Sequence, residues 1–143
     1  MDRIDRIEAE RACERLVMLY ALAVNSWNID EFVALFTPDA VWQRPRVPAL
    51  NGHDEIRAFM KSQPAERTLR HVNGLCCVTL ADDGQSATSI SQTTVFDTPV
   101  RGVLPVKLMG VDMVVEYRDR MVKTDAGWLI ARRDTTQVFS SHV

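Results

Sequence analysis

The spacing of the apolar residues changes in the middle of this chain, and that change constrains the fold more than any other feature. In the first half, apolar side chains recur at steps of three and four residues, which is typical of amphipathic helices. From about residue 68 onward, long runs rich in Val, Ile, Thr and Tyr predict β-strands. Helices followed by a long sheet indicate an α+β fold.

Three helices are expected in the first half. The first runs from about Ile4 to Val24. The second begins after an N-cap at Asn28 and continues through Phe36, until Pro38 ends it. The third follows Gly52. The four expected strands are approximately Thr68 to Leu80, Ala87 to Asp97, Val106 to Lys123 and Trp128 to Phe139.

The strands are separated by short turns at Gly84 and Gly127, which predicts consecutive antiparallel pairing. Strands of a dozen residues must twist and bend. The expected architecture is therefore a cone-shaped, curved antiparallel or mixed sheet, with the three N-terminal helices packed over its concave face. Because no repeat or linker interrupts the chain, residues 1–143 are expected to form a single domain.

Composition narrows the class of partner. The formal net charge is -2, and no Lys/Arg cluster suggests a nucleic-acid partner. No apolar run approaches the roughly 20 residues of a membrane span, and the N-terminus is charged from Asp2. A cytoplasmic protein without a membrane partner is expected. Its three cysteines are expected to be reduced thiols.

Several segments, taken in order, resemble one known family. They are Tyr20 to Asn25, Leu35 to Trp42, Gly52 to Phe59, Arg70 to Gly74 and Tyr117 to Arg133. Together they look like a SnoaL-like domain of the nuclear transport factor 2-like superfamily, which also holds ketosteroid isomerase, scytalone dehydratase and hexachlorocyclohexane dehydrochlorinase. The resemblance implies helices in the open mouth of a curved sheet, and a homodimer formed through the outer face of that sheet.

The main candidate for chemistry is His71, because an imidazole inside an apolar strand is costly unless it is partnered or used. The resemblance implies that His71 matches a histidine that abstracts a proton from substrate, paired with an aspartate at the end of the first helix. Here that position is Asn25, a neutral amide that can orient the ring but supplies no charge. Tyr20 is the third candidate catalytic residue. The alternative is a core histidine bonded to Asn25 or Tyr20.

Four further residues are candidates for substrate binding. Trp27, Phe36 and Trp42 could line a pocket for a flat apolar ligand, or simply pack in the core. Asn73 shares a strand face with His71 by alternation. No spacing typical of a metal site and no glycine-rich phosphate loop is present, so neither a metal nor a cofactor is expected.

Other polar residues are weaker candidates. His53 is expected to be solvated beside a helix cap, and His142 belongs to a C-terminal tail. Asp112, Glu116 or Asp119 could supply the missing carboxylate in space. The simpler expectation for these three is a set of exposed charges paired with neighbouring arginines.

These observations predict a cofactor-independent proton-transfer enzyme, of the isomerase, dehydratase, cyclase or lyase type, acting on a small hydrophobic and cyclic substrate. The first alternative is a binding module that uses the same pocket without turnover, which Asn25 favours. The second is a protein resembling the β-subunit of a ring-hydroxylating oxygenase, because those subunits share the fold.

Overall fold

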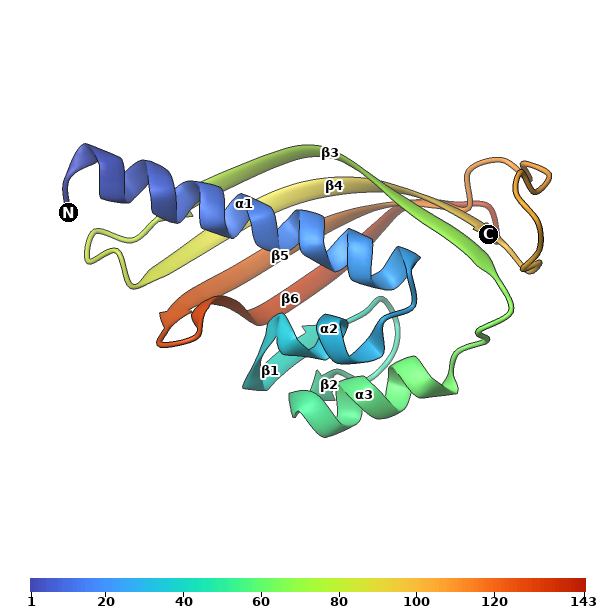
Figure 1. Cartoon of the computed structure of the whole chain (residues 1–143), viewed down its shortest axis with the longest axis horizontal. Helices are drawn as coiled ribbons and strands as arrows, with labels where there is room; N and C mark the ends of the chain where they lie inside the picture. The colour runs from blue at the N-terminus through green and yellow to red at the C-terminus, as the bar shows by residue number, and fades with distance from the viewer.

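A computed structural model describes residues 1–143 and shows a long, curved sheet with helices on its concave side (Figure 1). The helices are α1 (Arg3–Asn25), α2 (Ile29–Ala34) and α3 (Gly52–Ser62). The strands are β1 (Phe36–Gln43), β2 (Leu50–Asn51), β3 (Thr68–Leu80), β4 (Ser86–Thr98), β5 (Met113–Thr124) and β6 (Gly127–Ser140). The predicted α+β class is confirmed.

The six strands form one mixed sheet in the order β2-β1-β6-β5-β4-β3. The four long strands pair consecutively and antiparallel, as the turn glycines predicted. Both glycines have positive φ, 66° at Gly84 and 98° at Gly127, which a side chain would disfavour. The strand β1 instead pairs parallel with β6, which places the segment between α2 and α3 against the last strand.

The first helix begins at a capping box, in which the Asp2 side chain accepts from the Asp5 N–H at 2.9 Å and the Asp5 carboxylate accepts from Asp2. One face of α1 is buried along its length against the sheet, mainly against β3. Figure 1 shows α1 lying across the concave face, with α2 and α3 beside its C-terminal end. A cavity lies between the end of α1 and the inner surface of the sheet.

Two sequence expectations are corrected. Phe36 was expected in the second helix, but α2 ends at Ala34 and Phe36 starts β1, where it is fully buried. The third long strand was expected from Val106, but β5 starts at Met113. In the antiparallel register, Met113 pairs with Val95 and β4 continues only to Thr98, so residues 106–109 lie beyond the end of β4 and have no partner there.

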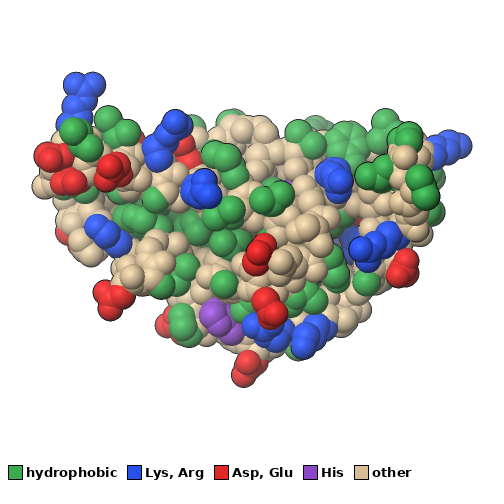
Figure 2. Space-filling view, in the orientation of Figure 1, with side chains coloured by type: hydrophobic (Ala, Val, Ile, Leu, Met, Phe, Trp, Pro, Cys, Tyr) green, Lys and Arg blue, Asp and Glu red, His purple; other side chains and the backbone are tan.

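The segment 99–112 forms an exposed apolar loop at one end of the sheet, drawn in orange in Figure 1. Figure 2 shows hydrophobic side chains gathered at that end of the molecule and along α1. The most exposed members in the loop are Val103, Leu104, Leu108 and Met109. All three cysteines are free. No helix combines the length and the apolarity that a membrane span requires.

Candidate functional site

The end of α1 is joined to β3 by two hydrogen bonds, both accepted by the side-chain oxygen of Asn25. Asn25 Oδ1 accepts from the backbone N–H of His71 at 2.8 Å and lies 3.1 Å from Nδ1 of the same residue. Asn25 is the last residue of α1, and His71 is the fourth residue of β3. The two candidate residues, 46 positions apart in the chain, are therefore direct neighbours.

This geometry fixes the tautomer of the imidazole. The backbone N–H of His71 can only donate, so the Asn25 atom that faces it must be the oxygen. Because that same oxygen faces Nδ1, Nδ1 carries the proton and donates it. Nε2 then holds the free lone pair of the ring, and it has no hydrogen-bond partner within the protein.

The surroundings keep the imidazole neutral. Burial lowers the pKa of His71 from 6.5 to about 4, and the nearby cations Arg133 and Arg67 contribute to that shift. Asn25 supplies no negative charge to oppose these effects. At pH 7 the ring is therefore a neutral base with one lone pair available.

His71 lies in the wall of a cavity of about 370 Å³. Tyr20, Trp27 and Trp42 also line it, together with apolar residues from β3, β4, β5 and α3. The rings of Tyr20 and His71 are 6.3 Å apart and nearly perpendicular. This combination of aromatic walls and a few polar groups is typical of a small-molecule site.

Two of the residues suggested for substrate binding lie elsewhere. Phe36 packs in the core, with its ring centroid 5.4 Å from that of Phe32, and does not line the cavity. Asn73 faces inward like His71, but its amide donates to the Val17 carbonyl at 3.4 Å and accepts from Thr93 at 2.9 Å. Asn73 thus joins β3 to α1 and β4 outside the cavity lining.

Behind two tyrosines of the cavity wall, Tyr20 and Tyr117, lies a charged pair that sequence reasoning missed. Arg133 and Asp119 are fully buried and joined by two hydrogen bonds of 2.7 Å. The Arg133 guanidinium lies 4.0 Å from the ring centroids of both Tyr20 and Tyr117, between the two rings. Burial raises the pKa of both tyrosines, so their hydroxyls stay protonated as hydrogen-bond donors.

The expectation that Asp119 is an exposed charge is wrong, because it lies on the inner face of β5 and pairs with Arg133. The outer-face residue Glu116 does pair with Arg118, at 3.0 Å. Asp112 accepts from His142 at 2.7 Å. None of the three carboxylates bonds to His71, so Asn25 is its partner.

His53 has a specific contact rather than a solvated position. Its Nε2 lies 2.7 Å from the Phe36 carbonyl oxygen, which ties the start of α3 to β1. No group of three or more His, Cys, Asp or Glu side chains is arranged to hold a metal ion.

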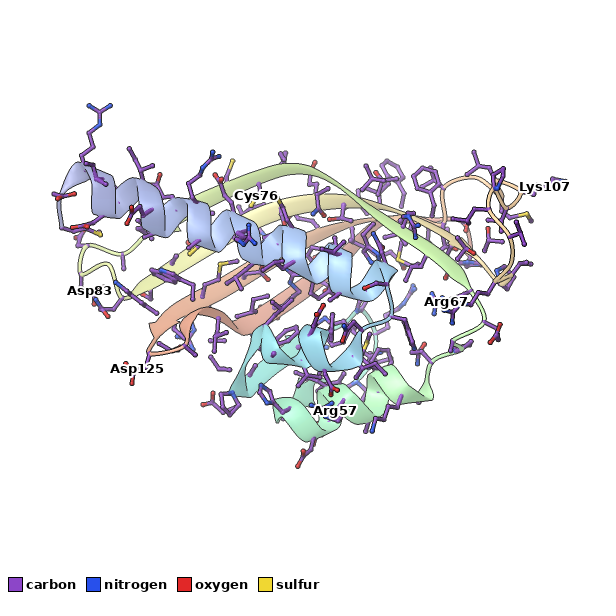
Figure 3. All side chains as sticks on the ribbon, viewed as in Figure 1. Arg57, Arg67, Cys76, Asp83, Lys107 and Asp125 are labelled. Atoms are coloured by element: carbon purple, nitrogen blue, oxygen red, sulfur yellow. The ribbon has the colours of Figure 1, made fainter.

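The mouth of the cavity carries three arginines: Arg44 and Arg46 come from the turn after β1, and Arg67 comes from the link between α3 and β3. Figure 3 labels Arg67 in that link. No aspartate or glutamate lines the cavity. Arg67 pairs with Asp97. The positions of the three arginines could not be predicted from periodicity, because the segments that carry them lie between helices and strands.

Comparison with known proteins agrees with this architecture. A model of the SnoaL-like domain matches residues 5–134. A comparison with curated proteins finds no match.

Solved structures give the same fold. An NTF2-like protein with a cystatin-like fold from Novosphingobium aromaticivorans has a TM-score of 0.79 and 22% identity, covering 98% of this chain and 88% of that chain. A scytalone dehydratase-like protein from the same organism has a TM-score of 0.77 and 21% identity, covering 93% and 87%. ActVI-ORFA from Streptomyces coelicolor has a TM-score of 0.75 and 20% identity, covering 93% and 97%.

The matched family model spans both the helices and nearly all of the sheet, including Asn25, His71 and the Asp119–Arg133 pair. This chain belongs to the family of SnoaL-like domains, with an NTF2-like fold.

Proposed function

We propose that this protein is a cofactor-independent proton-transfer enzyme, of the isomerase, dehydratase, cyclase or lyase type, acting on a small hydrophobic, cyclic molecule. The observation that carries the proposal is the hydrogen bond from His71 Nδ1 to Asn25 Oδ1, which leaves Nε2 with a lone pair in a residue that lines the cavity. A neutral imidazole with a fixed tautomer is the usual general base of enzymes.

In the proposed step, Nε2 of His71 removes a proton from a carbon next to a carbonyl group. The electron pair of the broken C–H bond forms a carbon–carbon double bond, and the carbonyl π pair moves to its oxygen. The hydroxyls of Tyr20 and Tyr117, both in the cavity lining, would donate to that developing oxyanion. The imidazolium then returns its proton to another carbon or to a leaving hydroxyl.

The low pKa of His71, about 4, makes it a weak base, and Asn25 adds no charge that would hold the transferred proton. The oxyanion contacts must therefore provide much of the stabilisation. A carboxylate base of similarly low pKa works in ketosteroid isomerase, because there the oxyanion is stabilised by strong hydrogen-bond donors.

The same two facts support a second candidate, a binding module that holds its ligand without turnover. A neutral partner and two repelling arginines both disfavour the imidazolium. In this case the aromatic cavity would keep its ligand specificity, while the proton transfer would be too slow to matter.

Deuterium incorporation from D₂O into a panel of cyclic ketones, followed by NMR, tests the proposal whatever the net reaction is. We expect exchange with the parent protein and a loss of about 100-fold or more in His71→Gln. His142→Gln, an exposed histidine remote from the cavity lining, is the matched control and should keep the parent rate.

The variant Asn25→Asp separates the two candidates, because an aspartate oxygen can accept the same hydrogen bonds while adding a negative charge. Exchange that appears only in Asn25→Asp would reject the enzyme hypothesis for the parent and favour the binding module. Exchange by the parent that survives His71→Gln would reject His71 as the base.

We also propose a homodimer formed through the outer face of the sheet. On that face, a row of paired residues runs across the four long strands from Val72 on β3 to Phe139 on β6. The residues at its two ends are apolar and exposed, Val72 by 53% and Phe139 by 68%. Light scattering should show a dimer that Phe139→Ser weakens and that Val103→Ser, in the exposed loop, does not. A monomeric parent would reject the proposal.

A cytoplasmic location, without nucleic-acid or membrane partners, is likewise a proposal. The net charge of -2 argues against a nucleic-acid partner. Cell fractionation with the protein in the membrane pellet would contradict it.

A further inference from the structure

The charges around the cavity are of one sign. Three arginines line it, and no aspartate or glutamate does. Arg67 has its own partner in Asp97, and Arg46 is exposed and contacts Gln137 at 3.3 Å. Arg44 differs from both, because its guanidinium makes no ion pair and no hydrogen bond within the protein.

Arg44 is half-buried and held against an aromatic wall. Its guanidinium carbon lies 3.7 Å from the ring centroid of Phe59 and 5.6 Å from that of Trp42. Burial lowers the pKa of Arg44, which reflects the cost of desolvating an unpaired cation. A guanidinium stacked by its face keeps its N–H groups at the edge of its plane, where they can bind an anion.

The turn that carries Arg44 is braced. The side-chain amide of Gln43 donates to the Arg44 carbonyl at 2.9 Å and to the Val47 carbonyl at 2.8 Å. Arg46 has a φ of 58°, a conformation that costs a non-glycine residue about 1 kcal/mol or more. The turn is therefore held in a specific shape, and this shape fixes the backbone of Arg44 beside the cavity.

We propose that the cavity binds an apolar ring compound bearing one carboxylate, and that Arg44 is the residue that binds the carboxylate. One free guanidinium matches one negative charge, and its planar edge matches the two oxygens of a carboxylate. The apolar walls, with Trp27 and Trp42 among them, accommodate the ring. This inference deepens the proposed function by naming the class of substrate, and it rests on that proposal for the identity of the cavity as the ligand site.

Calorimetric titration with 2-naphthoate and its neutral analogue 2-naphthamide tests the inference without requiring turnover. We expect the parent to bind 2-naphthoate about tenfold or more tightly than 2-naphthamide, the size expected for a hydrogen bond to a charged group. In Arg44→Gln this preference should fall to about twofold or less. Because the contact is ionic, added salt should weaken naphthoate binding and leave naphthamide binding largely unchanged.

The matched control is Arg11→Gln, which removes the same charge from an exposed position on α1, where the side chain is 78% exposed. It should keep the full preference. Arg44→Lys, which keeps the charge but loses the planar fork, should retain part of it and covers the case in which Arg44→Gln does not fold. NMR titration of His71 locates the ligand, because a bound anion should raise the His71 pKa and the amide should not.

The outcomes separate the two proposals. Equal binding of the two ligands by the parent, no binding of naphthoate, or an undiminished preference in Arg44→Gln would overturn the assignment of Arg44. Such results would not affect the proposal that His71 is the general base, which the exchange assay on neutral ketones tests independently. In His71→Gln, naphthoate preference should persist even though exchange is lost.

Discussion

Two arginines, one in the core behind the cavity wall and one in the cavity lining, are used in opposite ways. Arg133, in the core, is completely buried, shares two 2.7 Å hydrogen bonds with Asp119, and lies between two tyrosine rings. Arg44, at the mouth, is half-buried, stacks on Phe59 and has no carboxylate partner. Both are cations against aromatic rings, so the aromatic contact does not distinguish them.

The difference lies in the counter-charge. A buried cation that is paired with a buried carboxylate has a structural role, because removing the carboxylate leaves an uncompensated charge in a low-dielectric interior. A partly buried cation without a partner is a cost to the folded state that an anionic ligand can offset. The comparison separates a structural arginine from one that is available for binding, and three experiments can break or sharpen it.

The largest effect is expected at the buried Asp119–Arg133 pair. Asp119→Asn removes the charge that neutralises Arg133 and should lower the free energy of unfolding by about 3–5 kcal/mol. Urea denaturation measures this loss. The control Asp134→Asn breaks the half-exposed pair with Arg132 on the outer face and should cost less than about 1 kcal/mol. Equal losses in the two variants would mean that the Asp119 pair is not structural.

An intermediate effect is expected at His71, whose protonated form is disfavoured by burial and by repulsion from Arg133 and Arg67. Its pKa is about 4 in the folded protein and 6.5 as the reference value, so the unfolded chain takes up the proton first as the pH falls. The stability contributed by the neutral ring is therefore complete above pH 6.5 and is lost progressively toward pH 4. The loss is on the order of 3 kcal/mol.

Urea unfolding of the parent and of His71→Gln at pH 7.5 and at pH 4.5 isolates this contribution, because all other titrating groups are common to both proteins. The parent should lose about 2–3 kcal/mol more than the variant on acidification. Identical pH dependence in the two proteins would show that the folded environment does not disfavour the imidazolium.

The smallest effect is expected at the mouth. Arg44→Met removes an unpaired cation together with its contact to Phe59, so the two contributions oppose each other. The free energy of unfolding should stay within about 1 kcal/mol of the parent value, measured in urea at neutral pH. A loss as large as that of Asp119→Asn would show that Arg44 is structural after all.

Much of the fold could be predicted because its signals are local. β3 has the bounds that its composition predicted, and Gly84 and Gly127 occupy the predicted turns. The early start assigned to the third strand shows the limit of this reasoning. The run 106–112 is apolar enough for a strand, but a strand also needs a hydrogen-bonded neighbour. Residues 106–109 lie beyond the end of β4, which therefore provides none for them.

The site was only partly predictable. The contact between Asn25 and His71 was among the expected alternatives, whereas the pairing of Asp119 with Arg133 depends on strand register across a bulge between Arg120 and Met121. A bulge changes which residues face inward, and the sequence does not locate it. Strand alternation at Arg132 and Arg133 was the available signal, since only one of two adjacent residues can face the core.

The double acceptance by Asn25 Oδ1 makes the length of α1 a determinant of where the imidazole points. Each helical residue advances the side-chain direction by about 100°. If α1 ended one residue earlier or later, the Asn25 carboxamide would point away from β3. The backbone N–H of His71 would then lack its acceptor, and the imidazole would be free to rotate. Insertions or deletions anywhere along α1 should therefore disturb the aim of this side chain, even when they lie several turns from the cavity.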